Sequence, residues 1–196
     1  MSDRQRTILE AAVRTIARNG VRGLRVEEVA AEAGVSTSLL YYHFKDRAGL
    51  VHRTLEFINE RTGDSTDPSG ASDQSPRGMI EHQLLMELQD TPAAREDSTA
   101  WGELRAAAVF EPGLQQTLAD STQVWVDEVD EAIQAAQQAQ EASRDIDPRA
   151  AAERLTSLIE GLSERWLSGS LTQERAVFLL RGAIDAELGP PPSRLP

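Results

Sequence analysis

The chain has 196 residues, of which 40% are hydrophobic, and it carries a formal net charge of −12. This length allows one large domain or two small ones with a packed core, and the absence of cysteine excludes disulfides and thiolate chemistry. No apolar run approaches the ~18 residues that a membrane span needs, and the N-terminus MSDRQRTILE lacks the apolar stretch of a signal peptide, so we expect a cytoplasmic protein.

The N-terminal part of the chain predicts a series of helices. Ser2 or Asp3 can cap the first helix, in which apolar residues recur at helical spacing until Asn19-Gly20 ends it. A short second helix and a short third helix follow. Asp46 can cap a fourth, longer helix whose apolar residues also lie at helical spacing.

The stretch from Val29 to Arg47 predicts two short helices joined by a tight turn. Gly34 supplies the backbone freedom that a sharp turn needs, and the Ser36 hydroxyl can cap the helix that follows. That helix is expected to run from about residue 37 to residue 44. This is the layout of a helix-turn-helix, in which the second helix lies in the major groove of DNA.

The second helix of this motif has two different faces at about 100° per residue. Leu40 and Phe44 are four residues apart and are expected to face inward. The opposite face has polar and aromatic side chains, which suit contacts with base edges, thymine methyl groups and phosphates. These side chains are Ser38, Tyr42 and Lys45, flanked by Leu39 and Tyr41.

The body of the chain also predicts helices throughout. A polar segment rich in Gly, Pro and Ser, residues 63–76, is expected to be a mobile loop. The apolar spacing then predicts helices near residues 79–88, 94–110 and 114–143, one that starts at Asp147-Pro148, and a last one from Thr172 to Gly189. The tail, residues 190–196, is expected to be disordered or extended.

The N-terminal pattern resembles that of the TetR family of transcriptional regulators. The residues that carry the resemblance are Ile8, Ala11, Ala12, Gly20, Val29-Ala30, Ala33 to Ser36, Leu40 to Lys45, and Leu50. The resemblance implies an all-α protein of about nine helices, with a three-helix DNA-binding head and a C-terminal helical bundle for ligand binding and dimerisation. Without the resemblance, the same residues also fit a small helical bundle with a tyrosine-rich surface helix.

The resemblance implies a division of the chain and a set of DNA contacts. The expected parts are a helix-turn-helix domain (1–47), a linking helix (48–62), a flexible loop (63–76), an effector-binding and dimerisation domain (77–189) and a disordered tail (190–196). The expected DNA contacts are Arg25, Thr37, Ser38, Leu39, Tyr41, Tyr42, His43, Lys45 and Arg47. His43 also fits a half-buried capping role.

The sequence departs from the family pattern at two places in the head. Arg25 and Val26 stand where many relatives carry a capping threonine, which removes a helix cap and adds a cation near the DNA. Leu39 replaces a small hydroxyl residue and can make only apolar contact with a base. Base preference therefore cannot be transferred from relatives.

The charge of the chain is divided unevenly. Residues 1–53 hold nine Arg or Lys and six Asp or Glu, a balance of +3, whereas residues 54–196 hold eleven and 26, a balance of −15. A mildly basic head in front of an acidic body orients the molecule on DNA and disfavours other poses.

The body looks similar to the C-terminal part of TetR-family regulators, which bind small effectors between their helices. The expected ligand-binding residues are Met79, His82, Met86, Trp101, Arg105 and Trp125. A structural role for His82 and plain core packing for the tryptophans are the alternatives.

The last helix carries apolar residues on more than one stripe, which predicts that one side packs on its own body and the other on a second copy. The expected dimer-interface residues are Leu155, Leu158, Ile159, Leu162, Val177, Leu180 and Ile184.

No catalytic constellation, phosphate-binding loop or metal-spaced cluster is apparent in the sequence, so we expect neither an enzyme nor a cofactor. The favoured interpretation is a homodimeric repressor that binds double-stranded DNA at an inverted-repeat operator and leaves it when a small molecule binds. The alternatives are a helical small-molecule-binding protein or enzyme whose head does not regulate, and a protein-interaction module.

Overall fold

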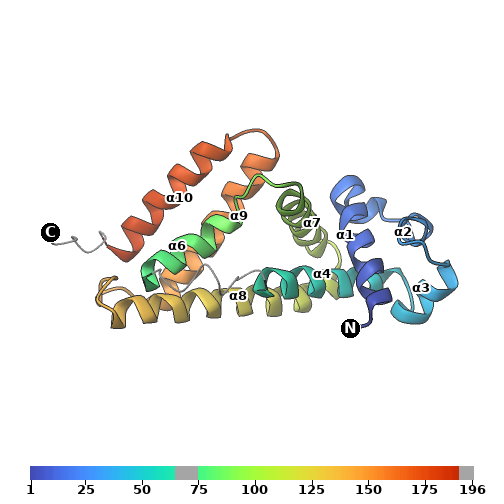
Figure 1. The fold of residues 1–196 in the computed structure, drawn as a ribbon, viewed down its shortest axis with the longest axis horizontal. Helices are drawn as coiled ribbons and strands as arrows, with labels where there is room; N and C mark the ends of the chain where they lie inside the picture. The colour runs from blue at the N-terminus through green and yellow to red at the C-terminus, as the bar shows by residue number, and fades with distance from the viewer. Residues whose placement is uncertain (65–74, 190–196) are drawn as a thin grey trace. The chain divides into compact units, whose positions relative to one another are not determined.

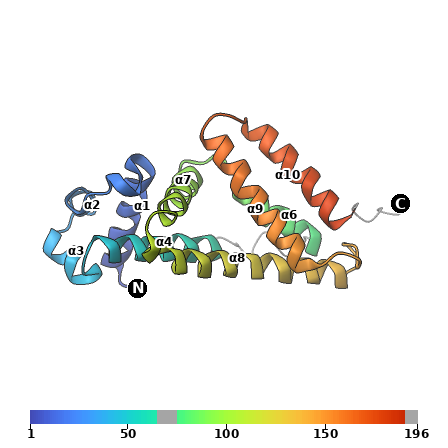
Figure 2. The ribbon, with the colours of Figure 1, turned by 180° about the vertical axis from the view of Figure 1, so that it is seen from behind.

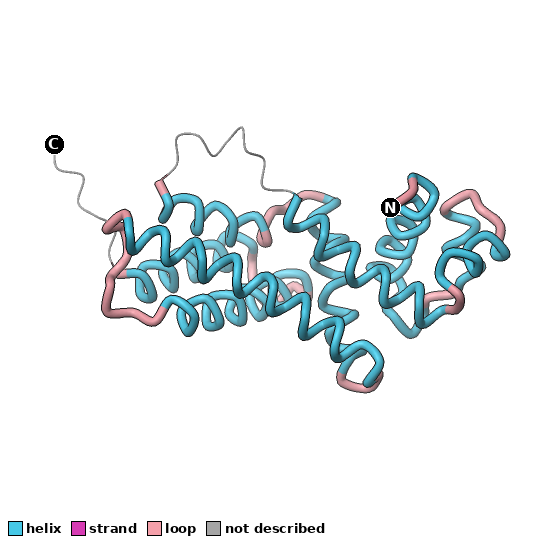
Figure 3. Tube along the Cα trace, turned by 90° about the horizontal axis from the view of Figure 1, so that it is seen from below, coloured by secondary structure: helices cyan, strands magenta, loops and turns pink. Residues whose placement is uncertain are grey.

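A computed structural model describes the backbone of residues 1–64 and 75–189, and the side chains of all of these except residues 61–64. Within these ranges the chain forms nine helices and no strand, which confirms the expected all-α class (Figures 1 and 3). The helices are α1 (Asp3–Gly23), α2 (Val26–Glu32), α3 (Thr37–Phe44), α4 (Arg47–Asp64), α6 (Pro76–Met86), α7 (Pro92–Ala108), α8 (Pro112–Gln138), α9 (Pro148–Leu167) and α10 (Gln173–Leu188). The tail and most of the predicted loop, residues 65–74, lie outside the described residues.

The described residues form two compact units. Unit 1 holds residues 1–64 and 95–121, and unit 2 holds residues 75–94 and 122–189, so that α8 contributes to both. No helix in the described part of the chain is long and apolar enough to cross a membrane.

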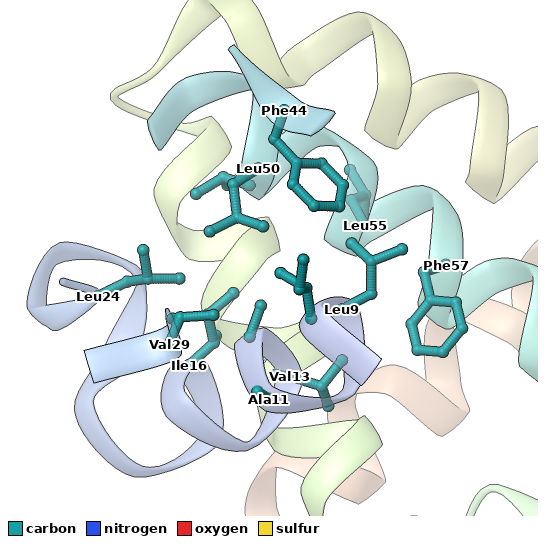
Figure 4. Close-up of a cluster of buried hydrophobic side chains, with 14 of the residues drawn as sticks. Leu9, Ala11, Val13, Ile16, Leu24, Val29, Phe44, Leu50, Leu55 and Phe57 are labelled. Atoms are coloured by element: carbon teal, nitrogen blue, oxygen red, sulfur yellow. The ribbon is translucent and has the colours of Figure 1, made fainter. Parts of the chain in front are cut away.

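The core of unit 1 is built on α1. Ser2 caps this helix by a reciprocal pair of hydrogen bonds with Gln5, and its apolar stripe is buried against α2 and α4. Figure 4 shows Leu9, Val13 and Ile16 of α1 in the same cluster as Leu50 and Leu55 of α4. The predicted stop at Asn19-Gly20 is instead a kink, because Gly20 adopts a φ of 71° and one more helical turn follows it.

Helix α7 and the start of α8 belong to the same core. Ala100, Leu104 and Ala108 of α7 and Leu114 of α8 are buried in the cluster that contains the helix-turn-helix. His52 of α4 also lies 3.1 Å from the hydroxyl of Thr117 on α8. The packing therefore does not follow the division that we expected at residues 63–76.

A second set of contacts joins α7 to the kink of α1. A Cβ atom at Gly20 would lie 2.7 Å from a carboxylate oxygen of Glu103, the end of a flexible side chain that can move away, so glycine is favoured there mainly by its φ of 71°. The Arg22 guanidinium lies over the Phe110 ring, 5.2 Å from its centroid, just after the end of α7. The end of α1 therefore lies beside Glu103, and Arg22 contacts Phe110.

Unit 2 is a bundle of α6, the second part of α8, α9 and α10. Figures 1 and 2 show α9 and α10 joined as a helical hairpin, and these two helices pack against each other. Asp147 caps α9, whose first residue is Pro148, and Thr172 caps α10, as the sequence predicts. The core comprises Ile80, Leu84, Val129, Ile133, Leu155, Ile159, Leu180 and Ile184, among others.

An arginine ties three segments of unit 2 together. The Arg77 side chain is only 9% exposed, and its Nη2 donates a hydrogen bond to Asp185 on α10 over 2.7 Å. Its Nη1 donates to the Glu141 carbonyl over 3.2 Å, and the backbone amide of Arg77 donates to the Glu141 carboxylate over 2.9 Å. Glu141 follows α8, which ends at Gln138 rather than near Ser143 because Gln140 adopts a φ of 61°.

Candidate DNA-binding site

The turn between α2 and α3 has the geometry that the sequence predicts. Gly34 adopts a φ of 65°, a left-handed conformation in which a side chain would be strained. The Val35 side chain packs against the core of unit 1 and closes the corner. The Ser36 hydroxyl accepts a hydrogen bond from the Leu39 amide over 3.2 Å and so caps α3. The helix-turn-helix is therefore complete in its local detail.

Helix α3 has one buried and one exposed face, as predicted. Leu40 and Phe44 are buried at 0% and 4% exposure, whereas Tyr42 is 80% exposed and Tyr41 is 43% exposed. Ser38 and Lys45 are also exposed. An exposed tyrosine contributes little to the packing of the protein core. This face is therefore accessible to another molecule.

The remaining α3 residues lie at the edges of the exposed face. Thr37 and Leu39 are half-buried, and so is His43. The His43 ring contacts Tyr42 edge-on, with ring centroids 5.2 Å apart, and its centroid lies 6.1 Å from that of Phe44. His43 therefore supports the orientation of Tyr42, and its role as a DNA contact stays a prediction.

Arg25 stands at the N-cap position of α2 and provides no side-chain cap for that helix. Its side chain is 76% exposed, and the guanidinium Nε lies 4.0 Å from a Glu28 carboxylate oxygen, at the edge of ion-pair range. An exposed cation beside the first turn of α2 is compatible with the predicted contact to a phosphate.

Glu32 at the end of α2 joins this helix to α1. The Arg18 guanidinium donates a hydrogen bond that lowers the pKa of the Glu32 carboxyl; partial burial opposes this shift, and Arg14 adds to it. Because the folded-state pKa is lowered, the stabilisation is fully present above the ordinary carboxyl pKa and is lost as the pH falls through the lowered value. A charged Glu32 therefore strengthens the attachment of α2 to α1.

The corner between α3 and α4 is unusually tight. Lys45 has φ 65° and ψ −56°, and the Asp46 amide donates to the Phe44 carbonyl over 2.7 Å, which together define a classic γ-turn. The Asp46 carboxylate then accepts from the Gly49 amide over 2.7 Å and caps α4, as predicted. This conformation is rare for a residue with a side chain, and it places an exposed cation at the end of α3.

Arg47 lies in a different environment from Lys45. Its guanidinium donates hydrogen bonds to the carbonyl groups of Leu24 and Val21, at the end of α1, and the side chain is half-buried. Two of the five guanidinium N–H donors are used by backbone carbonyls, so the side chain has a role inside the protein, and its grip on a phosphate stays a prediction. A Cβ atom at Gly49 would lie only 2.2 Å from the Phe44 backbone oxygen. The sequence predicts neither this close approach nor the carbonyl partners of Arg47, since both depend on contacts that only the folded chain makes.

The predicted effector-binding residues are divided between the two units. Trp101 and Arg105 belong to α7 in unit 1, whereas Met79, His82, Met86 and Trp125 belong to unit 2. His82 is exposed and Met79 is 44% exposed, while both tryptophans are half-buried. The Met86 sulfur accepts a hydrogen bond from Gln89 over 2.6 Å. Among the residues that the structure describes, no cluster of His, Cys, Asp or Glu could hold a metal ion.

The predicted dimer interface needs correction. Five of the seven residues, Leu155, Ile159, Leu162, Leu180 and Ile184, are at most 3% exposed and lie in the core of unit 2, so they are not available to a partner. Of the other two, Leu158 is 36% exposed and Val177 is half-buried. Phe178 of α10, which is not in the predicted set, is 64% exposed.

Two family descriptions match the chain. The description "Bacterial regulatory proteins, tetR family" matches residues 8–54, and "BetI-type transcriptional repressor, C-terminal" matches residues 76–189. A curated relative, the HTH-type transcriptional regulator BetI of Burkholderia mallei (strain NCTC 10229), is 25% identical over 193 residues, which cover 95% of this chain and 94% of the relative.

Solved structures agree with these matches. A protein from Rhodococcus sp. described as a TetR-family transcriptional regulator is 46% identical, with a TM-score of 0.90, and the match covers 96% of this chain and 100% of that one. A transcriptional regulator from Saccharomonospora viridis in complex with choline is 25% identical, with a TM-score of 0.77 and 95% of each chain covered. The chain belongs to the TetR family of bacterial regulatory proteins and is a DNA-binding transcriptional regulator.

Proposed function

We propose that this protein is a homodimeric repressor that binds an inverted-repeat operator in the cytoplasm through α3 and has no catalytic step of its own. The observation that carries the proposal is the division of α3 into a buried Leu40–Phe44 face and an exposed face with Tyr42 and Lys45. TetR-family regulators bind operator DNA and small-molecule effectors and form dimers. An enzyme or ligand-binding protein whose helix-turn-helix does not serve regulation would not bind DNA from its own upstream region.

Substitutions on the exposed face of α3 test the DNA contact. Lys45→Ala is expected to weaken binding to all DNA sequences and to reduce the slope of log affinity against log salt by about 0.9, because one phosphate contact is lost. Tyr42→Ala is expected to weaken operator binding by roughly tenfold or more with little change in that slope. Fluorescence anisotropy over a salt series measures both quantities.

The control for these variants is Arg144→Ala, which removes an exposed cation from unit 2 and should leave affinity and slope unchanged. All three variants should melt at the wild-type temperature, since the changed side chains lie outside the core. Wild-type binding by the double variant Tyr42→Ala/Lys45→Ala would show that α3 is not the recognition helix.

The exposed apolar residues of α9 and α10 support a dimer through this hairpin. Leu158→Asp/Phe178→Asp is expected to yield a folded monomer that binds the operator weakly, because one head then contacts only half of the site. Leu180→Asp places a charge at a position with 0% exposure and should instead unfold unit 2. Sedimentation equilibrium and circular dichroism distinguish the two outcomes. A wild-type monomer at micromolar concentration would contradict the dimer.

A quaternary ammonium compound is the effector class that the comparisons favour. The regulator from Saccharomonospora viridis holds choline, and the C-terminal match is to BetI-type repressors. Aromatic faces attract such cations, and each unit has a half-buried indole ring to offer, Trp101 on α7 in unit 1 and Trp125 on α8 in unit 2.

Choline itself is the probe for this proposal. Millimolar choline is expected to quench or enhance tryptophan fluorescence and to release the operator, and operator DNA should weaken choline binding by the same factor, since the two effects are linked. Trp101→Phe and Trp125→Phe identify which indole reports the ligand. Unchanged fluorescence and unchanged operator binding in choline would exclude this effector class while leaving the DNA-binding role intact.

A further inference from the structure

The first residue of α4 is joined to the last turn of α1. The Arg47 Nε donates a hydrogen bond to the Leu24 carbonyl over 3.2 Å, and its Nη2 donates to the Val21 carbonyl. The Val21 carbonyl also accepts from the Leu24 amide over 3.2 Å. A guanidinium at the C-terminal carbonyls of a helix is favourable because the helix dipole is negative there. Arg47 therefore joins the link between α1 and α2 to the start of α4.

The corner beside Arg47 connects this anchor directly to α3. The Lys45 amide donates to the Tyr41 carbonyl over 2.8 Å, and Asp46 closes the γ-turn on Phe44. Only Lys45 and Asp46 stand between α3 and α4, and this corner contains no flexible linker. An anchor on residue 47 therefore limits how far α3 can tilt relative to α1.

We propose that Arg47 is a positioning residue, which holds the recognition helix at a fixed angle to α1 and does not itself bind a phosphate. The proposal rests on the DNA-binding role of α3. Two donors of one planar group bind two carbonyls that lie three residues apart, and lysine has no planar fork with which to reproduce this arrangement. The two cations at the corner thus have separate tasks: Lys45 is exposed to solvent, and Arg47 donates to carbonyl groups inside the protein.

The salt dependence of DNA binding separates the two roles. For Arg47→Ala and Arg47→Lys, we expect operator affinity to fall by roughly tenfold or more, because charge-assisted hydrogen bonds are lost. The salt slope should stay at the wild-type value, whereas Lys45→Ala lowers it by about 0.9. The ratio of operator to non-specific affinity should also fall in both Arg47 variants, because a misplaced α3 loses base contacts before it loses the general attraction to phosphates.

Hydrogen exchange tests the same proposal without DNA. In Arg47→Lys we expect faster amide exchange in α3 and at Leu24, at a temperature where circular dichroism shows the wild-type helix content. If Arg47→Ala does not fold, Arg47→Lys carries the test alone. A wild-type protein that binds no operator would refute the DNA-binding role, whereas the exchange result would still decide whether Arg47 fixes α3.

The result that would overturn the proposal is equally specific. If Arg47 instead contacts a DNA phosphate, Arg47→Ala should lower the slope of log affinity against log salt by about 0.9. A phosphate contact also predicts that Arg47→Lys retains most of the affinity, and that neither variant changes the specificity ratio or the exchange of α3. Those outcomes together would show that Arg47 contacts DNA and does not position α3.

Discussion

Replacing Gly49 by alanine is expected to destabilise unit 1 by about 3 kcal/mol, because it forces an atom into an occupied position. The new Cβ would lie 2.2 Å from the backbone oxygen of Phe44 and 3.4 Å from its carbonyl carbon. In the interior of a helix, alanine is normally more favourable than glycine by about 1 kcal/mol. A loss of stability in Gly49→Ala would therefore come from the close contact and not from helix propensity. Since Phe44 is the last residue of α3, operator affinity should fall as well. Thermal denaturation and anisotropy measure the two effects.

The control is Gly102→Ala in the middle of α7. No atom lies within 4 Å of a Cβ atom built there, so the helix preference should dominate, and the melting temperature should stay the same or rise. A Gly49→Ala protein as stable as Gly102→Ala would mean that the γ-turn at Lys45 relaxes without cost.

The second large effect is expected at Asp185 in unit 2. Asp185→Ala should cost about 3 kcal/mol, because it leaves the Arg77 guanidinium buried without its carboxylate partner. Arg77→Met should cost less, since the remaining Asp185 is 60% exposed and returns to water. The double variant should be more stable than Asp185→Ala alone. Chemical denaturation followed by circular dichroism gives the three free energies of unfolding.

An exposed ion pair between the same two helices provides the comparison. Arg181 on α10 and Glu81 on α6 lie 2.9 Å apart, and their side chains are 59% and 41% exposed. Glu81→Ala should therefore cost less than about 1 kcal/mol. Equal costs for Glu81→Ala and Asp185→Ala would show that burial of Arg77 adds nothing to its pairing.

The sequence predicts the helix-turn-helix because each of its features is local. The spacing of Leu40 and Phe44 sets the buried face, Ser36 caps its own helix, and Gly34 supplies its own backbone angle. The tight corner at Lys45 was not predicted, because a positive φ at a lysine has no sequence signal and follows from the packing of α3 and α4.

Apolar spacing identifies the buried side of a helix but not the partner that covers it. Leu180 and Ile184 were assigned to a dimer, yet they pack within their own subunit, whereas Phe178 on the same helix is exposed. The carbonyl partners of Arg47 are likewise hidden from a local pattern, because they lie more than twenty positions earlier in the sequence. Long-range contacts of this kind cannot be derived from a local pattern.

The shared core of unit 1 affects how this regulator can be recombined with its relatives. Leu104 and Ala108 of α7 and Leu114 of α8 are buried among the side chains of α1 and α4. A fragment cut after α4 would expose that apolar surface to water and lose its stabilisation. The helix-turn-helix domain therefore cannot be moved to another protein by itself. A chimera that joins this operator preference to the effector-binding domain of a relative has to include α7 and the first turns of α8.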